Sequence, residues 1–415
     1  MTTTAGTSSV DPNALLFEIL MTPEGKADPY PRYAALHEHA PVFESAMGGL
    51  VVTRYDDCSA VLRDGRFGKF EGDIGPNEGR LTEHQRERMN ADSRVRGRSM
   101  LFLNPPDHTR LRGLVSKAFT PRTVEALRPH IARLTDELLD GFAEQEDVMS
   151  ALAFPLPATV IGEMLGVPEG DRPMFQPLVR AATKSLDFTM TDDEFDAAMA
   201  ASDTMNAYFE GLVAERRKAP QGDLLSALIA ARDEGDRLTE DEIIATAILL
   251  FAAGFETTTN LIGNGLFALL RNPDQLQRLR DDPGLLRPGV EELLRWDSPV
   301  QIDGRLALEA AEVAGRDVPK DTFVITMISA GNHDPTHYTE PGRLDVGRDE
   351  GPCISFAAGI HYCLGAALAR LEGQVVLDRL LSHFSSMELA DHGPAYRDSF
   401  TLRGLVDLPV AFTRA

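Results

Sequence analysis

The stretch Ser355-Phe-Ala-Ala-Gly-Ile-His-Tyr-Cys-Leu-Gly-Ala-Ala-Leu-Ala-Arg-Leu-Glu372 joins a glycine-containing loop to a run of good helix-forming residues. Cys363 lies where the loop meets this helix, and the N–H groups and dipole at a helix N-terminus favour a thiolate. Gly359 and Gly365 have no side chain, so a flat ligand can approach the backbone there. The position of Phe356 predicts that its ring shields the sulfur from water.

Several roles are open to Cys363 on these residues alone. A lone cysteine is by default a buried structural residue, and a nucleophilic cysteine needs a base better placed than His361, two residues away. Zinc needs further ligands, which do not cluster here, and the only other cysteines are Cys58 and Cys353. Three scattered cysteines form no disulfide framework, which predicts a reducing compartment. An axial thiolate on haem iron is compatible with one cysteine among glycines.

A second unusual stretch lies inside the longest predicted helix. Thr239 and Glu242 form a capping box, and the run Glu240–Arg271 predicts a helix of roughly 48 Å at ~1.5 Å per residue. Its middle, Ala252-Ala-Gly-Phe-Glu-Thr-Thr-Thr259, combines a glycine, a carboxylate and three threonines that can bond back to preceding carbonyls. Two interpretations carry equal weight. One is a widened groove for dioxygen in which Glu256 and Thr257 relay protons, and the other is a kink with a satisfied buried glutamate.

The charge balance limits the possible partners. The chain has 415 residues, with 41 basic and 64 acidic side chains and a formal net charge of −23. This balance argues against binding to nucleic acid or to an anionic membrane surface. The N-terminus lacks the pattern of a signal peptide, so we expect a soluble cytoplasmic protein. We expect residues 1–12 to be disordered and residues 13–415 to form a single catalytic domain.

The motifs resemble those of a known family. The segment from Phe356 to Arg370 resembles the haem-binding signature of the cytochrome P450 superfamily, Phe-Gly-x-Gly-x-His/Arg-x-Cys-x-Gly. Ala357 replaces its first glycine, which is a mild departure if the backbone φ there is negative. Ala253-Gly-Phe-Glu-Thr257 matches the oxygen-activation motif of the superfamily. The resemblance runs in order along most of the chain.

Two further motifs extend the resemblance. Glu292-Leu-Leu-Arg295 matches the Glu-x-x-Arg motif, for which the resemblance implies a buried structural pair, with Arg343 as a possible third partner. By itself such a pair is more often an ordinary surface contact. The stretch Asn104-Pro-Pro-Asp-His-Thr-Arg-Leu-Arg112 is similar to the segment that binds the haem propionates in bacterial members. The resemblance implies that the propionate partners are His108, Arg112, Arg305 and His361.

The resemblance implies an α+β fold that is mainly α, a triangular helical prism around a haem with a long central helix. The parts expected to be rich in β structure are about 40–60, 305–328 and 385–415, and the α-rich parts are 107–300 and 363–384. Within them we expect a hairpin over 311–319 with its turn at Gly315, a strand over 322–328, and a closing hairpin over 401–412.

The implied activity is that of a haem-thiolate monooxygenase with haem b as cofactor and Cys363 as the axial ligand of the iron. One atom of dioxygen would enter a hydrophobic organic substrate by hydroxylation or epoxidation, with electrons from NAD(P)H through ferredoxin reductase and ferredoxin. We expect a monomer with a substrate from secondary metabolism, polyketide-like by preference. The alternatives are a terpenoid, steroid or fatty-acid hydroxylase, a peroxide-driven relative, and a haem carrier or gas sensor.

The resemblance also implies where substrate and redox partner bind. A basic patch around Arg110, Lys117 and Arg122 is expected to dock an acidic ferredoxin. The expected pocket residues come from the loop around 69–100, the central helix, and two later segments. They are Leu249, Ala252, Ala253, Phe255, Val300, Ile302 and the stretch from Leu402 to Leu405.

Overall fold

Helices make up most of the protein. The computed structural model describes residues 10–70, 81–91, 99–187, 189–233, 238–390 and 395–415. The helices are α1 (Pro12–Met21), α2 (Pro23–Ala27), α3 (Tyr30–His39), α4 (Tyr55–Arg63), α5 (Glu83–Ala91), α7 (Asp107–Val115), α8 (Pro121–Glu125), α9 (Arg128–Asp140), α10 (Pro155–Leu165), α11 (Phe175–Thr183), α12 (Asp192–Lys218), α13 (Leu224–Asp233), α14 (Glu240–Arg271), α15 (Pro273–Asp281), α16 (Leu286–Trp296), α17 (Ile328–Gly331) and α18 (Ala366–His383).

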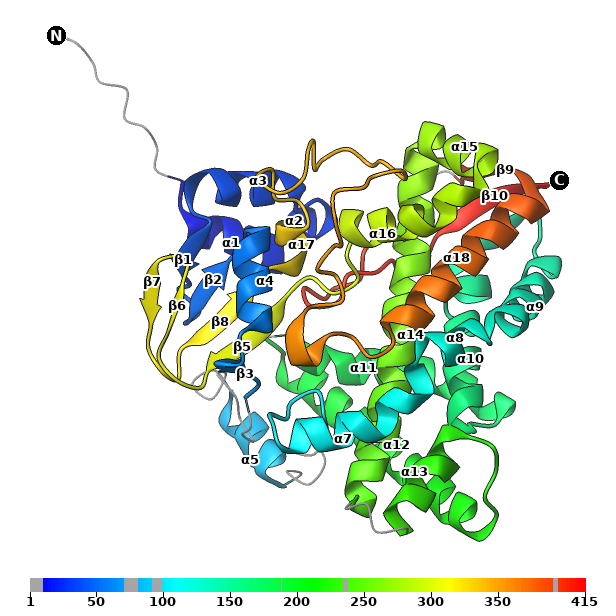
Figure 1. The fold of residues 1–415 in the computed structure, drawn as a ribbon, viewed down its shortest axis with the longest axis horizontal. Helices are drawn as coiled ribbons and strands as arrows, with labels where there is room; N and C mark the ends of the chain where they lie inside the picture. The colour runs from blue at the N-terminus through cyan, green and yellow to red at the C-terminus, as the bar shows by residue number, and fades with distance from the viewer. Residues whose placement is uncertain (1–9, 71–80, 92–98, 188, 234–237, 391–394) are drawn as a thin grey trace.

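Most strands lie on one side of the helices, beside α4, whereas β9 and β10 lie on the opposite side near α18 (Figure 1). A five-stranded sheet has the order β1-β2-β8-β5-β3, in which only β2 and β8 run parallel. A second sheet has the order β4-β10-β9, and β6 and β7 form the hairpin that was predicted around Gly315. The strands are β1 (Val42–Glu44), β2 (Leu50–Val52), β3 (Phe67–Gly68), β4 (Gln145–Asp147), β5 (Asp303–Ala307), β6 (Ala311–Val313), β7 (Arg316–Val318), β8 (Phe323–Thr326), β9 (Phe384–Leu389) and β10 (Pro409–Arg414).

The central helix α14 runs through the middle of the helical part, as predicted (Figure 1). The hydroxyl of Thr239 accepts the Glu242 N–H at 3.2 Å, and the Glu242 carboxylate accepts the Thr239 N–H at 2.8 Å, so the capping box forms. The helix packs against α10, α12, α16 and α18. Within the described ranges, α14 is the one helix that is long and apolar enough to cross a membrane, and 67% of its most apolar window is buried inside the protein.

Two expectations about the chain ends need correction. Helix α1 begins at Pro12, because the Asp11 side chain accepts the N–H of Asn13, so the ordered chain starts before residue 13; residues 1–9 lie outside the described ranges. The closing hairpin over 401–412 does not form. Strand β10 pairs with β9 and β4 instead, because Leu402 bridges to Val300 and leaves the later strand to other partners.

Candidate active site

Cys363 lies in the loop before α18, as predicted. The residue is exposed, whereas Cys58 and Cys353 are buried. Surrounding residues of the protein desolvate the sulfur, which raises the pKa of the Cys363 thiol. The backbone N–H of Gly365 and the charge of Arg112 lower this pKa. Desolvation thus favours the thiol, and the Gly365 N–H and the charge of Arg112 act in the opposite direction, toward the thiolate.

Phe356 contacts the backbone of Cys363. Its carbonyl accepts the Cys363 N–H at 2.9 Å, and its buried ring lies 4.4 Å from the guanidinium carbon of Arg370. Arg112 donates to the carbonyl of Tyr362, the residue before the cysteine. These contacts hold the loop on both sides of Cys363.

Two positions of the loop, Ala357 and Gly359, differ from what the sequence predicted. Ala357 has φ of 55°, a left-handed conformation, so the replacement of glycine there is strained rather than mild. Gly359 has φ of 70°, and a Cβ on it would lie 2.3 Å from the carbonyl oxygen of Leu62. Contact with the end of α4, and not a flat ligand, therefore requires this glycine. A Cβ on Gly365 would meet nothing within 4 Å, which is compatible with a flat ligand approaching there.

The predicted propionate partners come together in one cluster. The rings of His108 and His361 lie 4.2 Å apart, and among the described residues neither His108 Nδ1 nor His361 Nε2 has a hydrogen-bond partner. Burial and the charges of Arg112 and Arg305 lower the pKa of His108. Burial, followed by the charges of Lys69 and Arg305, lowers the pKa of His361 to about 3. Both imidazoles are therefore neutral donors beside a concentration of positive charge.

The charges of this cluster do not balance within the described part of the chain. Arg305 is 1% exposed, and none of its guanidinium nitrogens has a hydrogen bond, although Nη2 lies 2.8 Å from Asp303 Oδ2. Lys69 also pairs with Asp303. Three cations (Lys69, Arg112 and Arg305) thus face one carboxylate, an excess of two positive charges. Two propionates would supply the missing charges and acceptors, so these residues fit a haem.

One face of α14, which we call the open face, is only partly covered by protein, although most of the helix is buried. Leu249, Ala252, Ala253 and Thr257 recur at helical spacing along this face. Thr257 donates to the Ala253 carbonyl at 3.0 Å, the back-bond that was expected of this threonine. Gly254 has a packing role, because a Cβ there would lie 2.7 Å from Ile161 of α10.

Glu256 points away from this open face. It is 2% exposed and forms an ion pair with Arg397 of the C-terminal segment. Arg397 also donates to Asn260 at 2.6 Å. Burial lowers the pKa of Arg180 on α11, as does Arg397, whereas Glu256 raises it. The carboxylate is therefore held beside cations and is not open to solvent.

Several expected pocket residues lie elsewhere. Phe255 is 0% exposed and packs edge-to-face on Phe154. It follows Ala253 by two residues, which places it roughly 200° around the helix from the open face. Ile302 packs in the buried cluster that contains Leu20, and Leu405 lies in the main core. Val300 is partly buried and bridges to Leu402. Of the loop around 69–100, residues 71–80 and 92–98 lie outside the described ranges.

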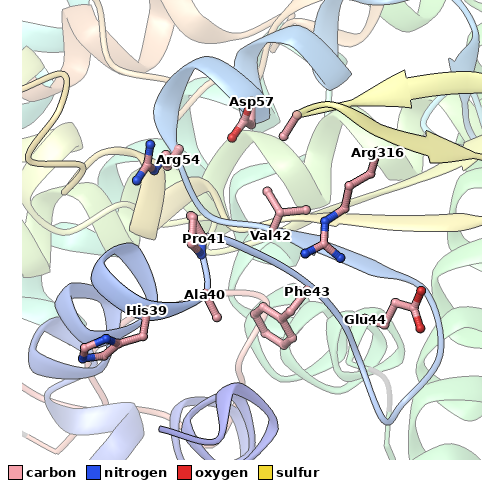
Figure 2. Close-up of a pocket in the computed structure, with 10 residues that line it drawn as sticks. His39, Ala40, Pro41, Val42, Phe43, Glu44, Arg54, Asp57 and Arg316 are labelled. Carbon is pink, nitrogen blue, oxygen red and sulfur yellow. The ribbon is translucent and has the colours of Figure 1, made fainter. Parts of the chain in front are cut away.

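The hollow drawn in Figure 2 is a different feature. It has a volume of about 680 Å³ and lies between β1, the start of α4 and the β6–β7 hairpin. Its charged lining mixes Arg54 and Arg316 with Glu44 and Asp57. No predicted site residue lines it, so it carries no part of the expected chemistry.

Glu292 and Arg295 form a buried pair rather than a surface contact. The two N–O distances are 2.6 and 2.8 Å, and both side chains are 2% exposed or less. The third partner is Arg348, whose Nε lies 3.1 Å from Glu292 Oε2. Arg343 takes part only through its backbone carbonyl, which accepts from Arg295 at 3.4 Å, because its side chain is 61% exposed and pairs with Glu340.

Three functional neighbours were missed from the sequence: Lys69, Arg397 and Arg348. Each lies in a loop or at the edge of a strand, outside any recognised motif. The one available signal for Lys69 is Asn104, whose amide bonds to the Lys69 N–H and carbonyl, both at 2.8 Å. Asn104 opens the predicted propionate segment, but its partner is set by tertiary structure.

Comparisons with known proteins agree with this geometry. The family profile described as cytochrome P450 matches residues 169–283 and 284–406. The polyketide biosynthesis cytochrome P450 PksS of Bacillus subtilis (strain 168) is 34% identical over 414 residues, covering 96% of this chain and 100% of that protein. The cytochrome P450 monooxygenase PikC of Streptomyces venezuelae is 39% identical over 402 residues, covering 94% of this chain and 92% of that protein.

A solved structure extends the likeness to three dimensions. The crystal structure of P450BioI in complex with a hexadec-9Z-enoic acid ligated acyl carrier protein matches with a TM-score of 0.87 at 37% identity, covering 94% of this chain and 99% of that chain. The chain belongs to the cytochrome P450 family. It has the expected fold, it is a monooxygenase of that family, and its cofactor is haem b.

Proposed function

We propose that this monooxygenase hydroxylates or epoxidises a hydrophobic, polyketide-like intermediate of secondary metabolism, and that it acts in the cytoplasm. The observation that carries the proposal is the conjunction of the exposed Cys363, the unbalanced cation cluster around Arg305 and the open face of α14. The identity to PksS, named for polyketide biosynthesis, supports the substrate class. When bound, a thiolate-ligated haem supplies the activation of dioxygen.

The chain contributes cofactor binding and proton supply. Cys363 would bind the haem iron through its thiolate. The propionates would be bound by His108, Arg112, Arg305 and His361, together with Lys69. These assignments follow from the charge imbalance of the cluster. A buried guanidinium without acceptors is costly, so binding the dianionic cofactor removes an unfavourable feature of the protein.

Thr257 and Glu256 are the proposed proton donors. The Thr257 hydroxyl lies on the open face, where it now donates to Ala253. The carboxylate of Glu256 is held by Arg397 and must leave this ion pair to protonate Thr257. Proton delivery therefore includes a side-chain movement, because the two groups project from different faces of α14.

Electrons would come from NAD(P)H through a ferredoxin reductase and a ferredoxin. Lys117 and Arg122 are exposed and remain candidates for docking the acidic ferredoxin. Arg110 is not a candidate for docking the ferredoxin, because its guanidinium pairs with Glu242 at 2.6 Å and with Asp107 at 3.0 Å. The docking surface is thus smaller than the patch expected from sequence.

Three alternatives from the sequence lose support. A peroxide-driven enzyme, a haem carrier or a gas sensor has no need of a proton-delivering acid and alcohol beside the cofactor. One observation supports fatty-acid oxidation as an alternative activity. The similar P450BioI structure was solved with a fatty acid ligated to an acyl carrier protein. We therefore retain an acyl substrate as the second candidate.

The test is reconstitution of the haem-loaded protein with NAD(P)H, a ferredoxin, its reductase and labelled dioxygen. Polyketide lactones, terpenoids, steroids and free or carrier-bound fatty acids would be screened by the change in haem absorbance on binding. We expect one labelled oxygen in the product of a polyketide-like substrate. Turnover that requires hydrogen peroxide and is not supported by NAD(P)H and dioxygen would contradict the proposal. Substrate binding without any NAD(P)H consumption would also contradict it.

A further inference from the structure

The C-terminal turn, which we define as Asp398–Leu402, lies between two parts of the active site. Just before it, Arg397 pairs with Glu256 of α14. Within it, Thr401 accepts the Gln301 N–H at 2.9 Å, and Leu402 bridges to Val300, shortly before the strand that carries Arg305. The turn is therefore connected both to the helix that carries Glu256 and Thr257 and to the segment that leads to Arg305.

Asp187 holds the turn from the connection between α11 and α12. Its carboxylate is fully covered, and Oδ1 accepts the Thr401 N–H at 3.1 Å and the Ser399 hydroxyl at 3.0 Å. The Thr401 hydroxyl returns a bond to the carbonyl of Leu186 at 3.0 Å. Lys184 donates to the Asp398 carbonyl at 2.6 Å. Four hydrogen bonds thus join residues 184–187 to the turn.

The two carboxylate oxygens of Asp187 have different environments. Oδ1 makes both bonds to the turn, whereas Oδ2 has no hydrogen bond among the described residues and lies 3.4 Å from Lys184 Nζ. Burial raises the pKa of Asp187. The turn needs only one acceptor atom, Oδ1, at residue 187. An asparagine keeps a side-chain oxygen there and removes the charge, so it is a matched replacement.

We propose that Asp187 is a positioning residue that fixes the C-terminal turn against the α11–α12 connection and thereby sets which substrates the active site admits. The part about substrate admission rests on the proposed function. The structural part, that Asp187 holds the turn, does not. Asp187 touches neither cofactor nor reacting atoms, so its effect passes through the backbone at Thr401 and Leu402.

Amide hydrogen exchange on the haem-loaded protein tests the structural part directly. Asp187→Ala removes both bonds from Oδ1, so exchange at Thr401 and Leu402 should speed up by about tenfold or more. Asp187→Asn keeps the acceptor and should stay near the wild type. Asp193→Ala, at an exposed aspartate in the first turn of α12, is the control. Unchanged exchange in Asp187→Ala, or equal acceleration in Asp187→Asn, would overturn the proposal.

Ligand affinity tests the second part, with econazole and hexadec-9-enoic acid as probes followed by haem absorbance. In Asp187→Ala the ratio of the two affinities, and KM more than kcat for any substrate turned over, should change by roughly three- to tenfold. If Asp187→Ala does not fold, Ser399→Ala leaves the buried carboxylate in place and removes the hydroxyl bond to Asp187, together with the bond from the Leu402 N–H to that hydroxyl. Accelerated exchange with an unchanged affinity ratio would leave Asp187 purely structural and refute its role in substrate admission.

The two proposals fail in different ways. If the wild-type protein shows no reduction by ferredoxin and no oxygen insertion, the proposed function fails, while the exchange result at Thr401 stands. If turnover is normal and Asp187→Ala changes neither exchange nor the affinity ratio, only the role of Asp187 fails.

Discussion

Ala357 is the residue at which this chain departs from the family signature, and its backbone is in the left-handed region with φ of 55°. A non-glycine residue there costs about 1–2 kcal/mol, partly offset by the entropy that glycine loses on folding. Ala357→Gly should therefore raise the free energy of unfolding by about 1 kcal/mol, measured by thermal or urea unfolding.

The neighbouring Ala358 provides the control. It has an extended backbone with φ of −152° and is 3% exposed, so Ala358→Gly should lower stability by about 1 kcal/mol. If Ala357→Gly destabilised the protein as much as Ala358→Gly, the left-handed conformation of the loop would be wrong.

The buried arginines around Glu292 lead to a second prediction. Arg348 shares the Glu292 carboxylate with Arg295 and is 9% exposed, whereas the Arg343 side chain is 61% exposed. Arg348→Gln should lower the free energy of unfolding by about 1–3 kcal/mol, because it leaves a buried carboxylate with one fewer donor. Arg343→Gln should change it by less than about 0.5 kcal/mol. Equal effects in chemical unfolding would contradict this network.

At the scale of elements, the contact between α14 and α18 contains an unexpected carboxyl group. Glu372 is 1% exposed, and neither oxygen has a hydrogen bond among the described residues. Burial raises its pKa from 4.5 to about 8, although Thr258 lowers it slightly. The folded state therefore binds a proton that the unfolded chain has released, and stability falls as the pH rises from about 4.5 to 8.

Glu372→Gln should remove this decline. One unit of pKa shift corresponds to about 1.4 kcal/mol, so the variant should gain up to roughly 3 kcal/mol at pH 7 and little at pH 4.5. Thermal unfolding of the haem-loaded protein across this pH range measures the difference. Glu388→Gln, at an exposed glutamate on β9, is the control. A gain that does not depend on pH would show that Glu372 is not protonated in the fold.

The elements differ in how well the sequence predicts them. Helix α14 carries its own boundaries, with a capping box at Thr239 and Asn272-Pro273 after its last residue, so both ends were predicted. Strand β10 carries no such information, because its partners β9 and β4 lie far away in the sequence. The predicted closing hairpin assumed a local partner, and the bridge from Leu402 to Val300 excludes it.

At the scale of the whole molecule, the active site is assembled from distant parts of the chain. Local motifs singled out Cys363 and Thr257, and the family resemblance alone implied the cluster around Arg305. Arg397 and Lys69 could not be predicted, because only the packing of the C-terminal segment and of the loop after β3 brings them to the site. The pocket was the weakest prediction, since helical phase places Phe255 on the far side of α14.

The central claim is that Cys363, alone among the three cysteines, ligates the haem iron. The most direct test is the carbon monoxide spectrum of the reduced, haem-loaded protein. The wild type, Cys58→Ser and Cys353→Ser should all show the long-wavelength band of a thiolate-ligated haem, and Cys363→Ser should lose it. Retention of that band in Cys363→Ser, or its loss in Cys353→Ser alone, would contradict the account.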